Sequence, residues 1–191
     1  MDVSAALLPL SFATPRSEAE RLRPCFLRAA DGDPDALAVL YDALSRDLYG
    51  FALWSCGSPE LAEDAVQEVF CRLAARRVRL PSRVREPRIW LLVAVRRAAL
   101  DSVRRRSRDI ELDERHLLAE PTEPGPAIDA HRAARAVAEL PRKLREAIFL
   151  RHFGELTFGE MGRVLGVPRF TAASRYRLGL ARLRRMMGVS R

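Results

Sequence analysis

Helix-start signals recur along the chain, and each one precedes apolar residues at helical spacing. Asp33-Pro34 and Ser58-Pro59 combine a capping side chain with a proline in the first helical turn. Thr157 and Glu160 have the Thr-x-x-Glu spacing of a capping box. No segment alternates polar and apolar residues as a half-buried strand does. The sequence therefore predicts an all-α protein.

A proline-rich, acidic stretch divides the predicted helices into two sets, and its composition is typical of a flexible linker. The chain is thus expected to hold two small helical domains, the second of them with a helix-turn-helix. The predicted parts are an N-terminal extension at 1–30, a first domain at 31–107, a linker at 108–127 and a second domain at 128–191. The expected helices cover about residues 18–30, 34–56, 59–77, 88–106, 129–140, 141–153, 157–165 and 168–187.

Positive charge is concentrated in two blocks. Residues 76–108 hold twelve arginines against two acidic residues, a net charge of +10, and seven arginines with no acid follow from residue 169. Residues 109–129, which lie between the blocks, carry a net charge of −6. Two basic blocks on separate helical units favour two surfaces that face a polyanion such as nucleic acid. The alternative is that these arginines only solvate helix faces.

Signals for an enzyme or a metal site are missing from the sequence. The three histidines are scattered, and no glycine-rich phosphate loop occurs. Cys25, Cys56 and Cys71 have no metal-ligand spacing, and we expect them to be buried thiols in a reducing compartment. We therefore expect no catalytic residues, no cofactor and no metal.

The sequence also predicts a cytoplasmic protein. Residues 3–13 are mildly apolar, but Pro9 interrupts them and no basic flank precedes them. No apolar stretch is long enough to span a bilayer.

A helix-turn-helix is predicted near the C-terminus, where Gly166-Val167-Pro168 separates a short helix from a longer one. On a helical wheel the longer helix has an apolar side and an opposite side rich in arginine. Arginine can pair with guanine through two hydrogen bonds, and hydroxyl groups can contact bases or phosphates. The alternative is an exposed amphipathic helix without a DNA partner. The candidate DNA-binding residues are Arg169, Phe170, Thr171, Ser174, Arg175, Arg177, Leu178 and Arg182.

Three sequence blocks, in this order, resemble the small extracytoplasmic-function (ECF) sigma factors of bacterial RNA polymerase. AEDAVQEVFCRL at 62–73 looks like the helix of that family that binds core polymerase. REPRIWLLVAVRRAALDSVRRR at 85–106 looks like its promoter-melting and minus-ten segment. LPRKLREAIFLRHFGELTFGEMGRVLGVP at 140–168 looks like the start of its minus-thirty-five domain. The resemblance covers residues 33–187 and makes the two domains sigma regions 2 and 4.

The resemblance implies a role for each block. Core polymerase would contact Asp64, Gln67, Glu68 and Arg72, although these residues also fit a solvated helix face. The helix-turn-helix residues would read the minus-thirty-five element. The separated minus-ten strand would contact Arg83, Arg85, Arg88, Trp90, Arg96, Arg97, Arg104 and Arg105. Trp90 could stack on bases, but packing in the core is the favoured interpretation.

Some residues depart from the usual pattern of the family. Arg97 stands where an asparagine is common, Phe170 replaces a glycine, and Ala173 replaces a basic residue. These differences bear on which promoter is recognised. Phe170 and Leu178 could contact thymine methyl groups, polymerase or an inhibitor.

The sequence thus predicts an alternative sigma factor that binds core RNA polymerase and directs transcription initiation at two promoter elements, without catalysis of its own. The resemblance further implies an anti-sigma factor as a partner, and the lack of a long apolar stretch predicts no membrane association. The competing hypothesis is a stand-alone helix-turn-helix regulator that binds duplex DNA without polymerase.

Overall fold

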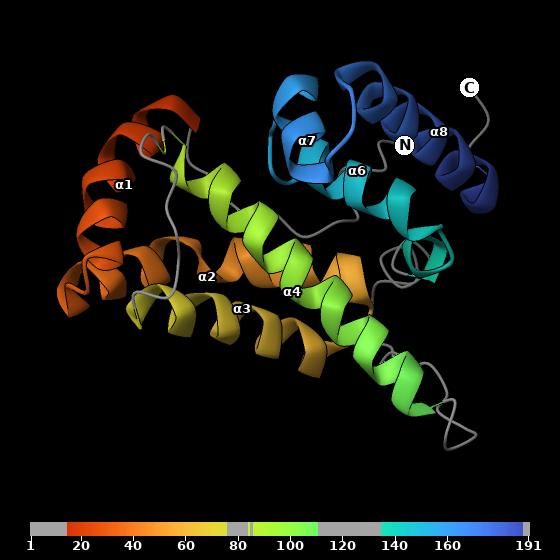
Figure 1. Ribbon diagram of the computed structural model, residues 1–191. Helices are drawn as coiled ribbons and strands as arrows, with labels where there is room; N and C mark the ends of the chain where they lie inside the picture. Colours follow the sequence, from red (N-terminus) through yellow and green to blue (C-terminus); the bar gives the residue numbers. More distant parts are fainter. Residues whose placement is uncertain (1–14, 76–83, 85, 111–134, 189–191) are drawn as a thin grey trace, which may run out of the picture.

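The computed structural model describes residues 15–75, 84, 86–110 and 135–188, and it contains helices but no strand within these ranges. The all-α prediction is therefore confirmed. The helices are α1 (Pro15–Ala30), α2 (Pro34–Cys56), α3 (Pro59–Ala74), α4 (Pro87–Ile110), α6 (Arg142–His152), α7 (Phe158–Leu165) and α8 (Arg169–Met187). Figure 1 shows α1 to α4 as one group and α6 to α8 as a second group beside it.

The predicted caps fix where these helices begin. The Asp33 carboxylate accepts hydrogen bonds from the backbone N–H groups of Asp35 and Ala36. Gly57, in the left-handed conformation at φ 76°, ends α2. At α7 the Thr157 hydroxyl and the Glu160 carboxylate form the reciprocal bonds of a capping box. Each cap satisfies helix-end groups that would otherwise lack partners.

The first group of helices surrounds a core built largely on α2. Leu40, Leu44 and Leu48 of α2 have no exposed surface. Helix α1, which lies in the part of the chain predicted as an extension, packs into the same core. Its Phe26 is fully buried and meets Trp90 of α4 edge-on, with ring centroids 5.3 Å apart.

The second group is a helix-turn-helix supported by α6. A Cβ atom on Gly162 would lie 2.6 Å from the Val167 carbonyl oxygen, so α7 and the following turn approach each other through this glycine. Gly166 adopts a φ of 67° at the turn itself. Farther along α8, a Cβ on Gly179 would lie 2.9 Å from Ile148 of α6. Glycines therefore set how α8 lies against α7 and α6.

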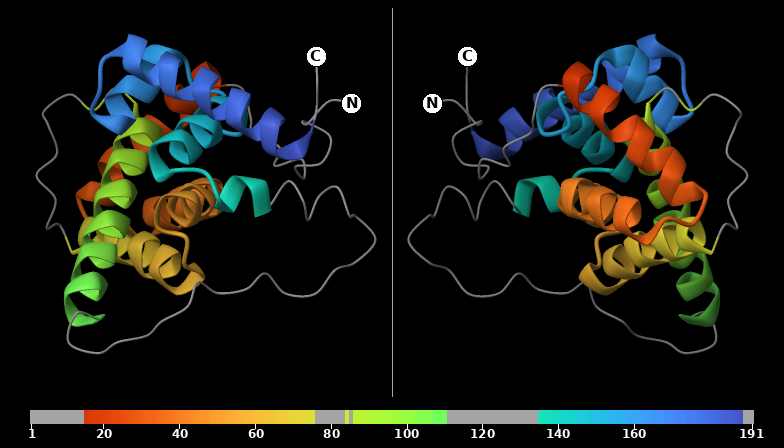
Figure 2. Two further views of the ribbon diagram at one scale, coloured as in Figure 1. Left: turned by 90° about the vertical axis from the view of Figure 1, so that its right-hand side faces the viewer. Right: turned by 90° about the vertical axis from the view of Figure 1, so that its left-hand side faces the viewer.

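The two groups also pack against each other, which the sequence did not predict. Helix α6 lies against α2, and α7 lies against α4. The ring of Phe149 on α6 is 5.6 Å from that of Phe51 and 5.4 Å from that of Trp54, both on α2. One continuous cluster of buried residues draws on both groups, and a smaller second cluster lies within α6, α8 and residues 136–140. In both turned views of Figure 2, the group of α6 to α8 lies over the group of α1 to α4.

Some sequence-based expectations were wrong or lie outside the described residues. Cys71 is exposed, because it lies on the outer side of α3, and only Cys25 and Cys56 are partly buried. Helix α4 continues to Ile110, beyond the predicted end at 106. Residues 135–138 are helical, whereas the rest of the predicted 108–127 linker and of the 129–140 helix falls largely within 111–134, outside the described residues.

The close approach at Gly162 gives a test of the helix-turn-helix. Gly162→Ala should destabilise the protein by about 1–3 kcal/mol, because the new methyl group would overlap the Val167 carbonyl. Urea unfolding followed by circular dichroism measures the change. Gly159→Ala is the matched control: its nearest neighbour is the Thr157 hydroxyl at 3.9 Å, so helix propensity alone should make it neutral or stabilising. Equal stability of the two variants would contradict the tight turn.

Candidate nucleic-acid and protein interfaces

Helix α8 presents an outer face on which arginines alternate with two large apolar side chains. The buried residues of this helix are Ala172, Ala173, Gly179 and Leu183. On the outer side Phe170 is 71% exposed and Leu178 is 59% exposed, so neither side chain is part of the core. Arg169, Ser174, Arg177 and Arg182 are also exposed, while Thr171 and Arg175 are half-buried. All eight predicted residues thus belong to one helix that lies on the outside of the molecule.

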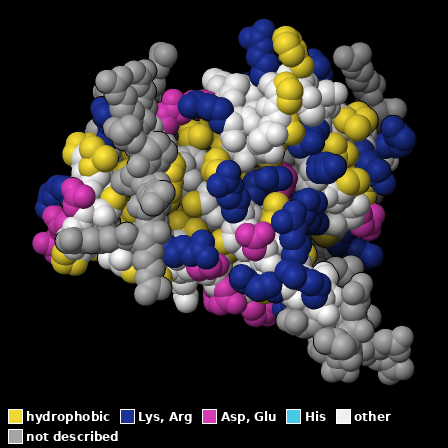
Figure 3. Space-filling model, viewed as in Figure 1, with side chains coloured by type: hydrophobic (Ala, Val, Ile, Leu, Met, Phe, Trp, Pro, Cys, Tyr) yellow, Lys and Arg dark blue, Asp and Glu magenta, His cyan; other side chains and the backbone are white. Residues whose placement is uncertain are grey.

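The positive charge of α8 is not neutralised by the described part of the chain. The ion pairs found among the described residues include none of the arginines of α8. The guanidinium of Arg169 lies 4.6 Å from the ring centre of Phe170, a cation–π contact at the start of the helix. Figure 3 shows basic side chains around α8 and again over the lower half of α4. The surface suits an anionic ligand.

Three of the arginines predicted on α4 are exposed. Arg97 is exposed on the middle of the helix. Arg104 lies 3.4 Å from the Asp101 carboxylate, and Arg105 donates to the Ser102 hydroxyl at 2.9 Å. Both of these contacts stay within α4 and near its surface, so they are weak and can be exchanged for a ligand. Arg83 and Arg85 lie outside the described residues.

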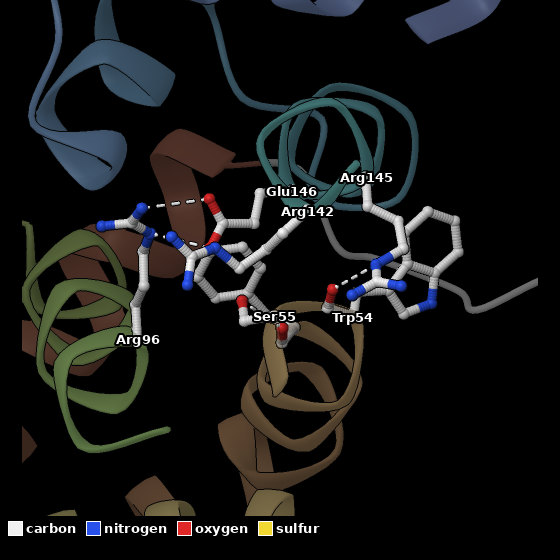
Figure 4. Close-up of polar contacts among 7 residues, drawn as sticks. Trp54, Ser55, Arg96, Arg142, Arg145 and Glu146 are labelled. Carbon is white, nitrogen blue, oxygen red and sulfur yellow. Dashed lines mark hydrogen bonds and ion pairs between the residues drawn. The ribbon is translucent and has the colours of Figure 1, made fainter. Parts of the chain in front are cut away.

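Arg88 and Arg96, by contrast, point into the contact between the two helical groups. Arg88 is 8% exposed; it donates to the Gly154 carbonyl and to the Asp47 carboxylate, both at 3.1 Å. Arg96 donates from Nε and Nη2 to the two carboxylate oxygens of Glu146, each at 3.0 Å. Figure 4 shows this two-pronged contact between α4 and α6. Two predicted DNA contacts are therefore engaged inside the protein.

Glu146 is the charged residue that the sequence analysis missed. It has no exposed surface, and its other basic neighbour, Arg142, lies 3.9 Å away on the same helix. Removing one partner of a buried ion pair typically costs about 3–5 kcal/mol, because the other charge remains buried. In sequence, Glu146 is one acidic residue in the basic helix RKLREAIFLRH, and its apolar neighbours were the only signal of its burial.

Further polar contacts join the two groups at the rim. Arg163 of α7 donates to Glu86 at 2.6 Å. Arg145 of α6 donates to the Trp54 carbonyl at 2.8 Å and to the Ala138 carbonyl at 3.0 Å. Burial lowers the pKa of Arg145 from its usual value, although the guanidinium stays protonated at any neutral pH. The contact thus combines an aromatic centre with several arginine hydrogen bonds.

The face of α3 that was predicted to bind a protein is exposed and adjoins a groove. Asp64, Gln67 and Arg72 are exposed, and Arg72 forms an ion pair with the half-buried Glu68. An open groove of about 440 Å³ runs between α3 and α2, and Gln67 lines it. The residues that α2 contributes were not predicted as contacts; they are Tyr41, Ser45, Arg46 and Tyr49. Tyr41 is 45% exposed beside this groove.

A metal-ligand cluster and a membrane-spanning helix are both absent from the described residues. Within them, no three His, Cys, Asp or Glu side chains gather as a metal ion requires. No described helix combines the length and the apolar character that crossing a bilayer takes.

Comparison with known proteins identifies the two helical groups. The family model "Sigma-70 region 2" matches residues 40–109, and "Sigma-70, region 4" matches residues 130–183. The chain is 25% identical over 171 residues to "ECF RNA polymerase sigma factor SigK" of Mycobacterium sp. (strain KMS), covering 85% of this chain and 89% of that one. It is 29% identical over 163 residues to "ECF RNA polymerase sigma factor RpoE" of Cereibacter sphaeroides, covering 81% and 88%.

Two solved structures share the fold. The sigma factor RpoE from Bartonella quintana, in complex with the anti-sigma factor NepR, superposes with a TM-score of 0.66 at 21% identity, covering 83% of this chain and 98% of that one. CnrH, in complex with the cytosolic domain of CnrY, gives a TM-score of 0.61 at 22% identity, covering 88% and 98%.

Trp90 can be tested as a core residue against the alternative of a base-stacking residue. Because it packs edge-on against the buried Phe26, Trp90→Ala should lower the free energy of unfolding by about 2–4 kcal/mol. Thermal and urea unfolding measure the effect. Arg97→Ala, at an exposed position of the same helix, should change stability by less than about 0.5 kcal/mol. A stable Trp90 variant that only loses affinity for single-stranded DNA would favour stacking instead.

Proposed function

The chain belongs to the sigma-70 family and is an alternative sigma factor of the ECF type, and from this we propose how its surfaces divide the work of promoter recognition. It binds core RNA polymerase through α2 and α3, and it reads promoter DNA through α4 and α8. The observation that carries this proposal is the pairing of two separate arginine-rich helices with the matches to regions 2 and 4, in that order. The protein acts in the cytoplasm, where polymerase and DNA are, as an initiation factor without catalysis of its own.

Helix α8 is the proposed reader of the minus-thirty-five element. Recognition helices contact bases through their N-terminal residues, which here include Phe170, Ser174 and Arg175. Arg175 suits a guanine, and the exposed ring of Phe170 suits a thymine methyl group. Arg177 and Arg182, about half a turn and about two turns beyond Arg175, suit phosphates.

The minus-ten element is the proposed ligand of α4 and the basic residues before it. Arg97, Arg104 and Arg105 are exposed and suit the phosphates of a separated strand. Arg88 and Arg96 belong to the same predicted set, together with Arg83 and Arg85 outside the described residues. Support for Trp90 as a stacking residue is weaker, since its ring packs against Phe26.

Core polymerase is the proposed ligand of the groove between α2 and α3. Asp64, Gln67, Glu68 and Arg72 give its rim charge and hydrogen-bonding capacity. Tyr41 and Tyr49 add the aromatic surface that is enriched in protein interfaces. An anti-sigma factor is a further proposed partner, because the similar RpoE of Bartonella quintana was solved with one.

A stand-alone regulator is the less favoured function. The reason is the match to Sigma-70 region 2 at residues 40–109, because a stand-alone helix-turn-helix regulator does not require that region. Such a protein would bind duplex DNA tightly without polymerase.

Titration of the fluorescently labelled chain with purified core polymerase tests the proposed function. Fluorescence anisotropy should report an affinity in the nanomolar range, near −12 kcal/mol. Run-off transcription by the resulting holoenzyme on a library of promoters should then select a subset of sequences. A folded chain that does not bind core polymerase, or that binds duplex DNA equally tightly alone, would rule this function out.

Arg175→Ala tests the reading of the minus-thirty-five element. The substitution should weaken promoter binding by the holoenzyme by about 1–3 kcal/mol and relax selection at one base position, because a pair of hydrogen bonds to a base is lost. Selection from a promoter library measures both effects. Arg184→Ala, near the end of the same helix, should leave base preference unchanged. If Arg175→Ala weakens all sequences equally, the side chain contacts phosphate and not a base.

A further inference from the structure

Arg96 is assigned two ligands, promoter DNA and a carboxylate inside the protein. Arg96 is one of the proposed minus-ten contacts, yet its forked Nε/Nη2 edge is occupied by the Glu146 carboxylate, and its side chain is only 17% exposed. The planar guanidinium binds carboxylates and phosphates in the same forked geometry. Glu146 therefore occupies the position that a DNA phosphate would take. The Nε/Nη2 edge of Arg96 cannot hold the carboxylate and a phosphate at once.

The contact that presents Glu146 is broad. On its apolar side Phe149 packs against Phe51 and Trp54, and a Cβ on Gly50 would lie only 3.2 Å from the ring of Phe149. On its polar side Arg88 reaches the Gly154 carbonyl, so a second proposed minus-ten arginine also points across the contact. The described arrangement is thus a closed form, in which region 4 covers part of the DNA-binding helix of region 2.

The length of a promoter is incompatible with this closed form. The two elements are named for positions 25 nucleotides apart, which corresponds to about 85 Å of duplex at 3.4 Å per base pair. A compact chain of 191 residues has a radius of gyration of only about 16 Å. The two regions must separate before α4 and α8 can contact both elements.

We propose that Glu146 is a built-in competitor of promoter DNA: its carboxylate binds Arg96 in the closed form and lowers the affinity of region 2 for DNA until the two regions separate. The proposal rests on the proposed function, because it takes Arg96 to be a DNA contact. The apparent affinity for DNA falls in proportion to the fraction of open chain. A closed population of about 90% would lower the affinity about tenfold.

Glu146→Gln in the full chain tests the competition. The variant keeps the size of the side chain but removes the charge that holds Arg96. Small-angle X-ray scattering should show a larger radius of gyration than for the wild type. A labelled short single-stranded DNA of mixed sequence should bind about tenfold more tightly. In the double variant with Arg96→Ala the chain should still expand, but the gain in affinity should disappear.

Asp101→Asn is the matched control for net charge. Asp101 is a carboxylate on the same helix and contacts Arg104, but it does not bridge the two regions. This variant should remain compact and should not show the tenfold gain. An equal gain in both variants would mean that Glu146 acts only through net charge, and it would overturn the proposal.

A wedge variant keeps the test decisive if Glu146→Gln fails to fold. Gly50→Leu places a side chain against Phe149 and improves the helix propensity of α2, while both members of the ion pair remain. It should expand the chain and raise DNA affinity in the same way. Expansion without a gain in affinity overturns the proposal, as does a compact form in both variants or a wild type that is already expanded. Failure of the wild type to bind core polymerase would reject the proposed function, but it would leave the scattering result valid.

Discussion

The buried carboxylate of Glu146 is the constraint on which the arrangement of the two regions depends. A charge with no exposed surface is tolerated only when hydrogen-bonded cations surround it. Arg142, on the same helix, is 3.9 Å away, and so the close partner must come from α4. That requirement places α6 beside α4, and the rings of Phe149, Phe51 and Trp54, packed tilted and edge-on, fill the space between α6 and α2. The apolar contacts bury a large surface between the two regions, whereas the Arg96–Glu146 ion pair selects one orientation of α6 relative to α4.

Local signals made most of the individual helices predictable. Asp33, Ser58 and the pair Thr157–Glu160 mark helix starts by chemistry that acts within four residues, so no tertiary information was needed. The exposed arginines of α8 were predictable for the same reason, because a wheel of one helix suffices. The burial of Glu146 was not predictable in this way, since its partner lies 50 residues earlier in the chain. The exposure of Tyr41 was not predictable either, because its spacing along the helix matches that of the buried leucines of α2 and says nothing of the open groove beside it.

Arginine predominates on α4, and the same guanidinium chemistry serves both its contact with region 4 and its proposed contact with DNA. The guanidinium donates from a rigid fork to a carboxylate, a carbonyl or a phosphate, and it remains charged when it is partly buried. Arg88 uses this fork on a carbonyl and a carboxylate, and Arg96 uses it on a carboxylate alone. Lysine, a point charge without a planar fork, would lose the two-pronged contact with Glu146. One residue type can therefore serve in the protein interior and at a DNA backbone with little change in geometry.

Helix α2 places the groove and the contact between the regions on a single rigid element. Tyr41, Ser45 and Tyr49 face the groove, while Gly50 and Trp54 face α6. A partner in the groove therefore need not touch α6. Such a partner shifts the equilibrium between the closed and the open chain only if it binds one form more tightly than the other. Such a difference arises when the partner is large enough to contact region 4 as well, or when it occupies the space that region 4 covers. A partner as large as a polymerase can contact both regions, whereas a short peptide confined to the groove cannot.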